Sequence, residues 1–233
     1  MTQLLIIRHG QASFGTADYD RLSPTGERQA RLVGQHLAAA GQQFDVMFAG
    51  EMLRQTETAR LAAEAWAEPP ALQIDAAFNE YDPDALFRAY LPRVLQDNAD
   101  LSGRQDELFS DSRLFQKVFE RVTRHWIDDT PHDGGACERW PDFTARVEAG
   151  LTRLHDDYPP DSRIALFTSG GPTAVAIAAA VEASARKTIE MNWSIHNAAI
   201  SELRATRGGW RLTGFNDISA LRAAGDPALI TMR

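Results

Sequence analysis

The sequence contains a single cysteine, Cys137, among its 233 residues. An intrachain disulfide is therefore excluded, and a reducing compartment fits the count. Long apolar runs are also missing, since the most apolar stretch, around Ala174–Val181, is far too short to cross a membrane. The N-terminal residues show no basic segment followed by a long apolar one, so we expect no signal peptide. We expect a soluble cytoplasmic protein without a membrane partner.

Positive charge is scarce, because 24 Lys and Arg stand against 32 Asp and Glu and give a net charge of −8. A nucleic-acid binder normally carries a basic face, so we expect no nucleic-acid partner. A small phosphate ester is not excluded, because a local cluster of arginines suffices to bind it. The six histidines include no pair four residues apart and no Cys/His cluster. We therefore expect no metal site, and no other cofactor.

Short apolar runs alternate with helical patterns along most of the chain. Runs that are apolar at every position are typical of strands buried on both faces, as in a parallel sheet. The expected strands are Leu4–Ile7, Phe44–Ala49, Leu72–Ile74 and Ile164–Phe167, followed by a closing pair at Ile200–Leu203 and Trp210–Gly214. The alternation predicts an α/β fold, a three-layer sandwich with a mostly parallel central sheet flanked by helices.

Helix boundaries are also encoded locally. Ser23 or Thr25 is expected to cap the first helix, and Gly41 to end it. A second helical pattern covers Leu53–Trp66, and Pro69-Pro70 stops it.

The middle of the chain breaks the alternation. We interpret 1–233 as a single domain with a mostly helical insertion at about 83–130. The residues of one helical row with i, i+4 spacing are expected to be core, namely Leu114, Val118, Val122 and Trp126. Phe115 and Phe119 lie beside this row and are expected to be core as well. The alternative to a core role is that Phe115, Phe119 and Trp126 line an apolar ligand pocket.

Three expected strands lead into chemically suggestive residues. The first ends in Arg8-His9-Gly10, the second leads through Gly50 to Arg54, and the fourth ends in Thr168-Ser169-Gly170-Gly171 before a helix. Ligands of open α/β sheets bind beyond the carboxyl ends of the strands. A helix N-terminus adds unpaired N–H groups and the positive end of a dipole. The convergence predicts a phosphate site.

These segments resemble the histidine phosphatase superfamily, which includes cofactor-dependent phosphoglycerate mutases and many small phosphatases. The resemblance covers nearly the whole chain and rests on LIIRHGQAS, YDRLSPTGERQARLVGQHL, EMLRQTETA, FNEYD and LFTSGGP. It implies that His9 is a nucleophile that forms a phosphohistidine. It also implies that Arg8 and Arg54 bind the phosphoryl group and that Glu80 is the general acid. Asp82, Asp84 and Glu138 are rival candidates for the acid.

The sequence departs from the family pattern at three positions. Thr-Ser-Gly-Gly replaces the second signature, Ser-His-Gly-Gly, so Ser169 stands where the family has a second histidine. Gly15 stands where many members have asparagine, and Gly50 where serine is common. Loss of a charged donor is expected to cost about 10²–10³ in rate, by analogy with an oxyanion donor. His196 and His132 are conceivable substitutes, although we interpret both as ordinary loop residues.

The sequence therefore predicts a metal-independent phosphomonoesterase acting through His9, with Ser169 and Gly170 as further phosphate contacts. One alternative is a degenerate member that binds a phosphorylated ligand without turning it over, and a mutase is less favoured. The partner is expected to be a phosphate monoester, with specificity set by the insertion and the loop TPHDGGACERW. A homodimer formed through an edge strand at Leu72–Ile74 stays open.

Overall fold

The computed structural model describes residues 1–13, 20–98, 101, 108, 111–128 and 135–232. The chain divides into two compact units. The first unit consists of Met1–Glu80 together with Arg146–Arg233, and the second of Tyr81–Ala145. The second unit spans the whole segment, about 83–130, for which a helical insertion is expected. That the whole chain behaves as one domain stays a prediction.

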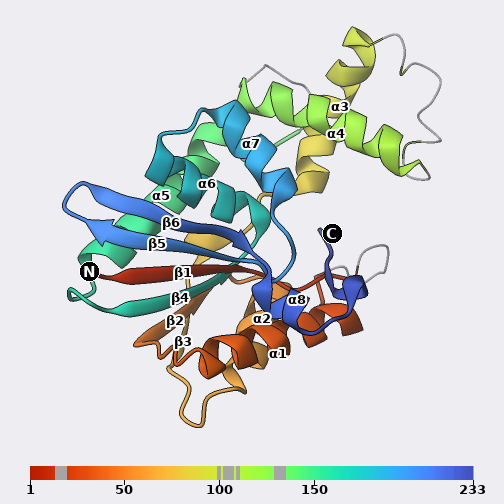
Figure 1. The fold of residues 1–233 in the computed structure, drawn as a ribbon. Coiled ribbons are helices and arrows are strands. Elements are labelled where there is room, and N and C mark those ends of the chain that lie inside the picture. Colours follow the sequence, from red (N-terminus) through yellow and green to blue (C-terminus); the bar gives the residue numbers. More distant parts are fainter. Residues whose placement is uncertain (14–19, 99–100, 102–107, 109–110, 129–134, 233) are drawn as a thin grey trace. The chain divides into compact units, whose positions relative to one another are not determined.

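A six-stranded sheet forms the centre of the first unit, in the order β3-β2-β4-β1-β5-β6 (Figure 1). The strands are β1 (Gln3–Arg8), β2 (Val46–Ala49), β3 (Leu72–Ile74), β4 (Arg163–Thr168), β5 (Ile200–Thr206) and β6 (Gly209–Asp217). The first four are mutually parallel, while β5 runs antiparallel to β1 and β6 antiparallel to β5. Every expected strand is present, and β3 lies at an edge of the sheet.

Helices cover both faces of this sheet, with α1, α2 and α8 on one face and α5 and α6 on the other (Figure 1). The helices of this unit are α1 (Pro24–Ala39), α2 (Leu53–Ala63), α5 (Trp140–Asp156, from Arg146), α6 (Gly170–Val181), α7 (Ala185–Ser194) and α8 (Ser219–Ala223), with short 3₁₀ turns at Ala76–Phe78 and Pro227–Leu229. Ile6 and Ile7 point to opposite faces of β1, and both are fully buried. The expected three-layer α/β sandwich with a mostly parallel sheet is therefore confirmed.

The core on the α1 and α2 side fixes the position of α2, which carries Arg54. Leu5 and Ile7 of β1 belong to the same buried cluster as Val33 of α1 and Ala59 and Ala62 of α2. Small residues on α2 let it approach α1 and the sheet closely. Burial of apolar surface of this kind contributes roughly 25 cal/mol per Å².

Local signals set the ends of α1 as expected. Ser23 is the N-cap, and its Oγ accepts a hydrogen bond of 3.1 Å from Gly26 N. Gly41, just beyond the helix, has φ of +72°, a conformation that favours glycine. Ser23, rather than Thr25, is thus the cap.

Two expected boundaries were too wide. β2 begins at Val46 rather than Phe44, and α2 ends at Ala63 rather than Trp66. Phe44 and Trp66 instead pack edge to face, with ring centroids 5.6 Å apart. Their apolar character therefore reflects a contact between loops, which periodicity alone does not distinguish from continued secondary structure.

The second unit is helical, with α3 (Pro83–Asp97) and α4 (Ser112–Ile127). The predicted row on α4 is buried, and consists of Leu114, Val118, Val122 and Trp126. Phe115 and Phe119 are only half-buried and stack on Phe87 at centroid distances of 5.2 and 5.5 Å. The core interpretation therefore holds for Trp126 but is wrong for these two phenylalanines. No helix in the described ranges has both the length and the hydropathy needed to cross a bilayer.

Gly34 marks the closest approach of α1 to α2. A Cβ built on Gly34 would lie 2.1 Å from the backbone oxygen of Ala62. Because that oxygen belongs to a helix backbone, Gly34→Ala is expected to lower the free energy of unfolding by about 1–3 kcal/mol, measured by urea denaturation. Gly208→Ala is the matched control, since nothing lies within 4 Å of a Cβ built there. Equal stability of the two variants would contradict this packing.

Candidate active site

The carboxyl ends of three neighbouring parallel strands, β2, β4 and β1, bring the predicted site residues to one edge of the sheet. β1 ends at Arg8 and β4 at Thr168, and these two residues are direct partners in the ladder. Ala49, the last residue of β2, pairs with Phe167. The residues that follow these strand ends, His9, Gly50 and Ser169, therefore lie at the same edge.

His9 is almost completely buried, with 6% of its surface exposed. Its Nδ1 lies 2.7 Å from the backbone oxygen of Gly10. A carbonyl only accepts hydrogen bonds, so Nδ1 carries the proton and Nε2 carries a lone pair. Arg54 Nε donates to Nε2 at 3.2 Å. The imidazole is thus held in the tautomer that a nucleophile at Nε2 requires.

The surroundings of His9 lower the pKa of its imidazole well below the ordinary value. Burial is the largest cause, because it removes water from the charged form. The positive charges of Arg54 and then Arg8 act in the same direction, and only the hydrogen bond to Gly10 opposes them. The imidazole is therefore neutral at neutral pH.

Gly10 connects this imidazole to two helices. Its N–H donates to Thr58 Oγ1 of α2 at 3.1 Å, and the same hydroxyl donates to the backbone oxygen of Arg54 at 2.6 Å. A Cβ built on Gly10 would lie 2.3 Å from the backbone oxygen of Gly26 in α1. Only glycine fits here, and the turn after β1 is fixed from both sides.

Arg54 is itself positioned by a carboxylate. Its side chain is 5% exposed, and its Nη1 lies 2.6 Å from Asp20 Oδ1. Asp20 Oδ2 also accepts from Leu53 N at 2.8 Å, at the start of α2. Sequence reasoning missed Asp20, because a carboxylate ahead of a helix cap is usually a solvated residue. Its two contacts hold the guanidinium so that Nε faces His9.

Arg8 lies beside the N-terminus of α6. Its Nη1 donates to the backbone oxygen of Ile195. A Cβ built on Gly170 would lie 3.7 Å from the guanidinium carbon of Arg8 and 2.3 Å from Asn192 Oδ1. The glycine thus allows Asn192 to approach α6 closely, and Arg8 lies at ordinary contact distance from the same helix start.

Ser169 is the N-cap residue of α6 and is fully buried, yet its side chain makes no capping hydrogen bond. Its Oγ instead accepts from Gln55 Nε2 at 2.8 Å. Gln55 follows Arg54 on α2 and is also fully buried. Sequence reasoning missed Gln55, since a polar residue on a helix is usually exposed.

Glu80 reaches the same helix end. Its Oε2 accepts from Gly171 N at 3.0 Å, in the first turn of α6. The rival candidate Asp82 has another role, because its Oδ1 caps α3 by accepting from the backbone of Asp84 and Ala85. Asp82, Asp84 and Glu138 belong to the second unit.

The two histidines considered as substitutes fall outside this cluster. The imidazole of His196 lies 3.4 Å from Asn216 Oδ1, and no residue of the site is its partner within the described ranges. His132 and Gly15 lie outside the described residues, as does part of the loop that contains His132. Among the residues that are described, no three His, Cys, Asp or Glu side chains come together as a metal site.

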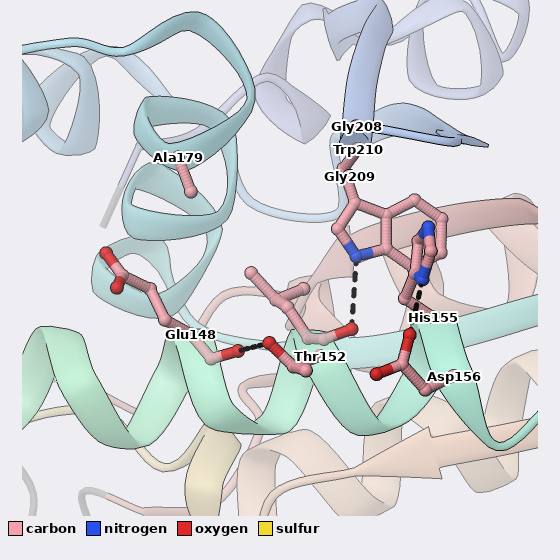
Figure 2. Close-up of a pocket in the computed structure, with 9 residues that line it drawn as sticks. Glu148, Thr152, His155, Asp156, Ala179, Gly208, Gly209 and Trp210 are labelled. Atoms are coloured by element: carbon pink, nitrogen blue, oxygen red, sulfur yellow. Dashed lines mark hydrogen bonds and ion pairs between the residues drawn. The ribbon is translucent and has the colours of Figure 1, made fainter.

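A separate hollow of about 380 Å³ lies at the other end of the strands, beside α5 and the turn between β5 and β6 (Figure 2). It is lined by Glu148, Leu151, Thr152, His155, Asp156, Ala179, Gly208, Gly209 and Trp210. Two of its titratable lining residues interact with each other, since His155 Nδ1 is 2.7 Å from Asp156 Oδ1. His155 Nε2 is 3.0 Å from the backbone oxygen of Thr206, the last residue of β5. This end of β5 lies near the start of β1, where Gln3 pairs with Arg204. This hollow contains none of the predicted site residues.

Comparison with known proteins identifies the family of this chain. The model of the family described as "Histidine phosphatase superfamily (branch 1)" matches residues 4–94 and 96–218 of this chain. This chain belongs to the histidine phosphatase superfamily. A phosphoglycerate mutase from Candida albicans is 35% identical over 72 residues, which are 28% of this chain and 29% of the mutase. The chain thus aligns with less than a third of that relative's length.

Solved structures of phosphatases share the fold. A phosphoserine phosphatase from Entamoeba histolytica, in complex with 3-phosphoglyceric acid, superposes with a TM-score of 0.64 at 17% identity, over 95% of this chain and 100% of the other. A mycobacterial glucosyl-3-phosphoglycerate phosphatase gives a TM-score of 0.62 at 21% identity, over 92% and 98% of the two chains. At this identity the likeness concerns the fold.

The buried imidazole of His9 gives a first prediction for this site. Because its pKa is lowered on folding, the ring is expected to stay neutral with the proton on Nδ1 as the pH falls through about 6.5. The unfolded chain takes up a proton in that range, so this stability contribution is present above about pH 6.5 and declines as the pH falls toward the folded pKa. Imidazole ¹⁵N NMR, assigned with His9→Gln, measures the titration. A midpoint at or above 6.5 would contradict the burial.

His155 gives the opposite sign. The hydrogen bond to Asp156 is the main cause that raises the pKa of His155, and the bond to Thr206 adds to it. Its contribution to stability is therefore fully present below about pH 6.5 and is lost as the pH rises through the raised folded pKa. His155→Gln is expected to cost about 0.5 kcal/mol at pH 6 and less at pH 8 in urea unfolding. His36→Gln is the control, and an identical pH dependence of both variants would rule this out.

Proposed function

We propose that this protein is a metal-independent phosphomonoesterase that forms a phosphohistidine on Nε2 of His9. One observation carries the proposal. A neutral imidazole, with Nδ1 bound to Gly10 and its lone pair on Nε2, is buried beside the guanidinium groups of Arg8 and Arg54. The arrangement supplies both the nucleophile and the positive charge that phosphoryl transfer needs. We propose further that it acts in the cytoplasm, as the lone cysteine suggests.

In the first step, Nε2 of His9 attacks phosphorus and the bond from phosphorus to the ester oxygen breaks. The leaving oxygen takes a proton from the carboxyl group of Glu80, which stands at the start of α6. Arg54 Nε, which donates to Nε2 of His9 in the structure, transfers its hydrogen bond to a phosphoryl oxygen. Its bidentate geometry, and that of Arg8, suits a phosphate better than lysine would.

In the second step, water attacks the phosphorus of the phosphohistidine and the bond from phosphorus to nitrogen breaks. The carboxylate of Glu80 takes the proton of the water, and inorganic phosphate leaves. The proton bound to Nδ1 stays on the ring throughout, because Gly10 holds it. His9 therefore returns to the neutral tautomer in which it began.

Two observations favour a phosphatase over a mutase. A mutase must protect its phosphoenzyme from water and grip both a monophosphorylated and a bisphosphorylated acid. The charged donor that the family has at the position of Ser169 is a neutral hydroxyl here. In addition, structural neighbours of this chain include proteins named as phosphatases. We therefore expect water as the acceptor and a phosphate monoester as the substrate.

Hydrolysis of p-nitrophenyl phosphate tests the proposal, with a chelator present throughout. The wild type is expected to turn over, and His9→Ala to lose activity by about 10³-fold or more, because removal of a nucleophile has effects of this size. Quenching in alkaline detergent after mixing with ³²P-labelled substrate should trap an acid-labile, base-stable label in the wild type and none in His9→Ala. His36→Ala, in the last turn of α1, is the matched histidine control and should retain activity.

The rival function is a degenerate family member that binds a phosphorylated ligand. It predicts binding of inorganic phosphate, detected by calorimetry, with no label on His9 and no turnover of several aryl phosphates. Retained turnover in His9→Ala would instead exclude the phosphohistidine route. Loss of wild-type activity on addition of chelator would remove the metal-independent step.

A further inference from the structure

Two departures from the family pattern, Gly50 and Ser169, meet at one side chain. Gln55 on α2 lies between them, and both Gln55 and Ser169 are fully buried. Gln55 Nε2 donates to Ser169 Oγ at 2.8 Å and to the backbone oxygen of Phe78 at 3.1 Å. The departures are therefore in contact through one carboxamide.

The direction of the bond between Gln55 and Ser169 follows from Phe78. The backbone oxygen of Phe78 only accepts, so the amide atom that faces it must be the NH₂ group. Ser169 Oγ, which faces the same NH₂ group, is then an acceptor. Within the described residues the hydroxyl hydrogen of Ser169 has no acceptor of its own. The hydroxyl hydrogen of Ser169 can thus be donated to a ligand.

The other end of the amide explains Gly50. A Cβ built on Gly50 would lie 2.1 Å from Gln55 Oε1, 2.8 Å from Asn79 Oδ1 and 2.9 Å from the backbone oxygen of Phe78. A serine at position 50 therefore does not fit unless these neighbours shift, and Gln55 Oε1 is the nearest of them. The glycine at 50, the glutamine at 55 and the serine at 169 form one compatible set.

Ser169 is also next to the nucleophile. His9 N donates to the backbone oxygen of Thr168 at 2.8 Å, and Arg8 and Thr168 are partners in the parallel ladder. The residues that follow, His9 and Ser169, thus leave neighbouring strands at the same level. A phosphoryl group on His9 would be held at this edge, beside the start of α6.

We infer that Gln55 and Ser169 act as one unit that replaces the missing histidine of the family. Gln55 is a positioning residue, whose NH₂ group engages a lone pair of Ser169 Oγ and turns the hydroxyl hydrogen toward an equatorial oxygen of the phosphoryl group. Ser169 is the catalytic residue that donates this hydrogen bond. The inference rests on the proposed function of His9 as the phosphoryl acceptor. A hydroxyl donor is neutral, so the contact is weaker than one from imidazolium.

A double-mutant cycle tests the unit, using Ser169→Ala, Gln55→Met and the double variant. Methionine keeps the volume of glutamine but has no donor, and Phe78 O retains a bond from Thr168 Oγ1 of 2.7 Å. With p-nitrophenyl phosphate, each single variant is expected to lower kcat by about 10–100-fold with a smaller change in KM. Inhibition by orthovanadate should weaken in parallel. The double variant should be no worse than Ser169→Ala, because both substitutions remove the same hydrogen bond.

The outcomes separate this inference from the proposed function. A wild type that labels His9 while Ser169→Ala keeps full kcat would overturn the inference and leave the function standing. Effects that multiply in the double variant would also overturn it, because independent side chains add in free energy. A wild type with neither turnover nor label would remove the function itself. Orthovanadate affinity then still measures whether the two side chains bind an oxyanion as a unit.

A steric exchange gives a second, independent readout. Ser169→His restores the residue that the family has, but Gln55 lies within 2.8 Å of the serine oxygen and occupies the space an imidazole needs. Ser169→His alone is therefore expected to lose activity and thermal stability. Gln55→Ala combined with Ser169→His should regain both, relative to the single variant. A gain of activity in Ser169→His alone would contradict the shared space.

Discussion

The hydrogen bond between His9 Nδ1 and the oxygen of Gly10 is the interaction on which the site depends. It is a bond to backbone, so it does not vary with pH and has only one possible direction. The burial that removes water from His9 and the two guanidinium groups then keep the ring neutral. Each element around the turn supports this one orientation: α2 through Thr58, and β4 through Thr168.

The charges around His9 are balanced rather than simply positive. A chain of net charge −8 concentrates two guanidinium groups at one strand end. Arg54 is matched by the carboxylate of Asp20, and α6 directs an N–H group toward Glu80. A phosphate entering this region meets donors that already have partners. Phosphate binding as we propose it is therefore an exchange of acceptors, in which the more highly charged phosphate competes with a carboxylate and an imidazole nitrogen.

Much of this could be read from the sequence, because the deciding signals are local. Runs apolar at every position give β1 and β4, and the strand ends then predict where Arg8, His9 and Ser169 meet. Side-chain directions are not local. The packing of α2 against its neighbours decides that Gln55 turns inward and that Asp20 reaches Arg54. In the sequence both are polar residues that could equally well be exposed to solvent. The prediction of a core position for Phe115 and Phe119 was wrong for the same reason, since apolar spacing does not show which aromatic rings stack in half-buried positions.

The contact between Gly10 and Gly26 makes the chemistry of His9 a property of how α1 is docked. A Cβ on Gly26 would lie 2.1 Å from the oxygen of Gln11, as a Cβ on Gly10 would meet Gly26, so the turn and the first turn of α1 shape each other. A state in which α1 is locally detached would keep the Arg-His-Gly segment but release Gly10, and with it the tautomer of the ring. If His9 is the nucleophile, as we propose, the lifetime of its Nδ1-protonated form is thus limited by the local opening of one helix, which is more frequent than global unfolding.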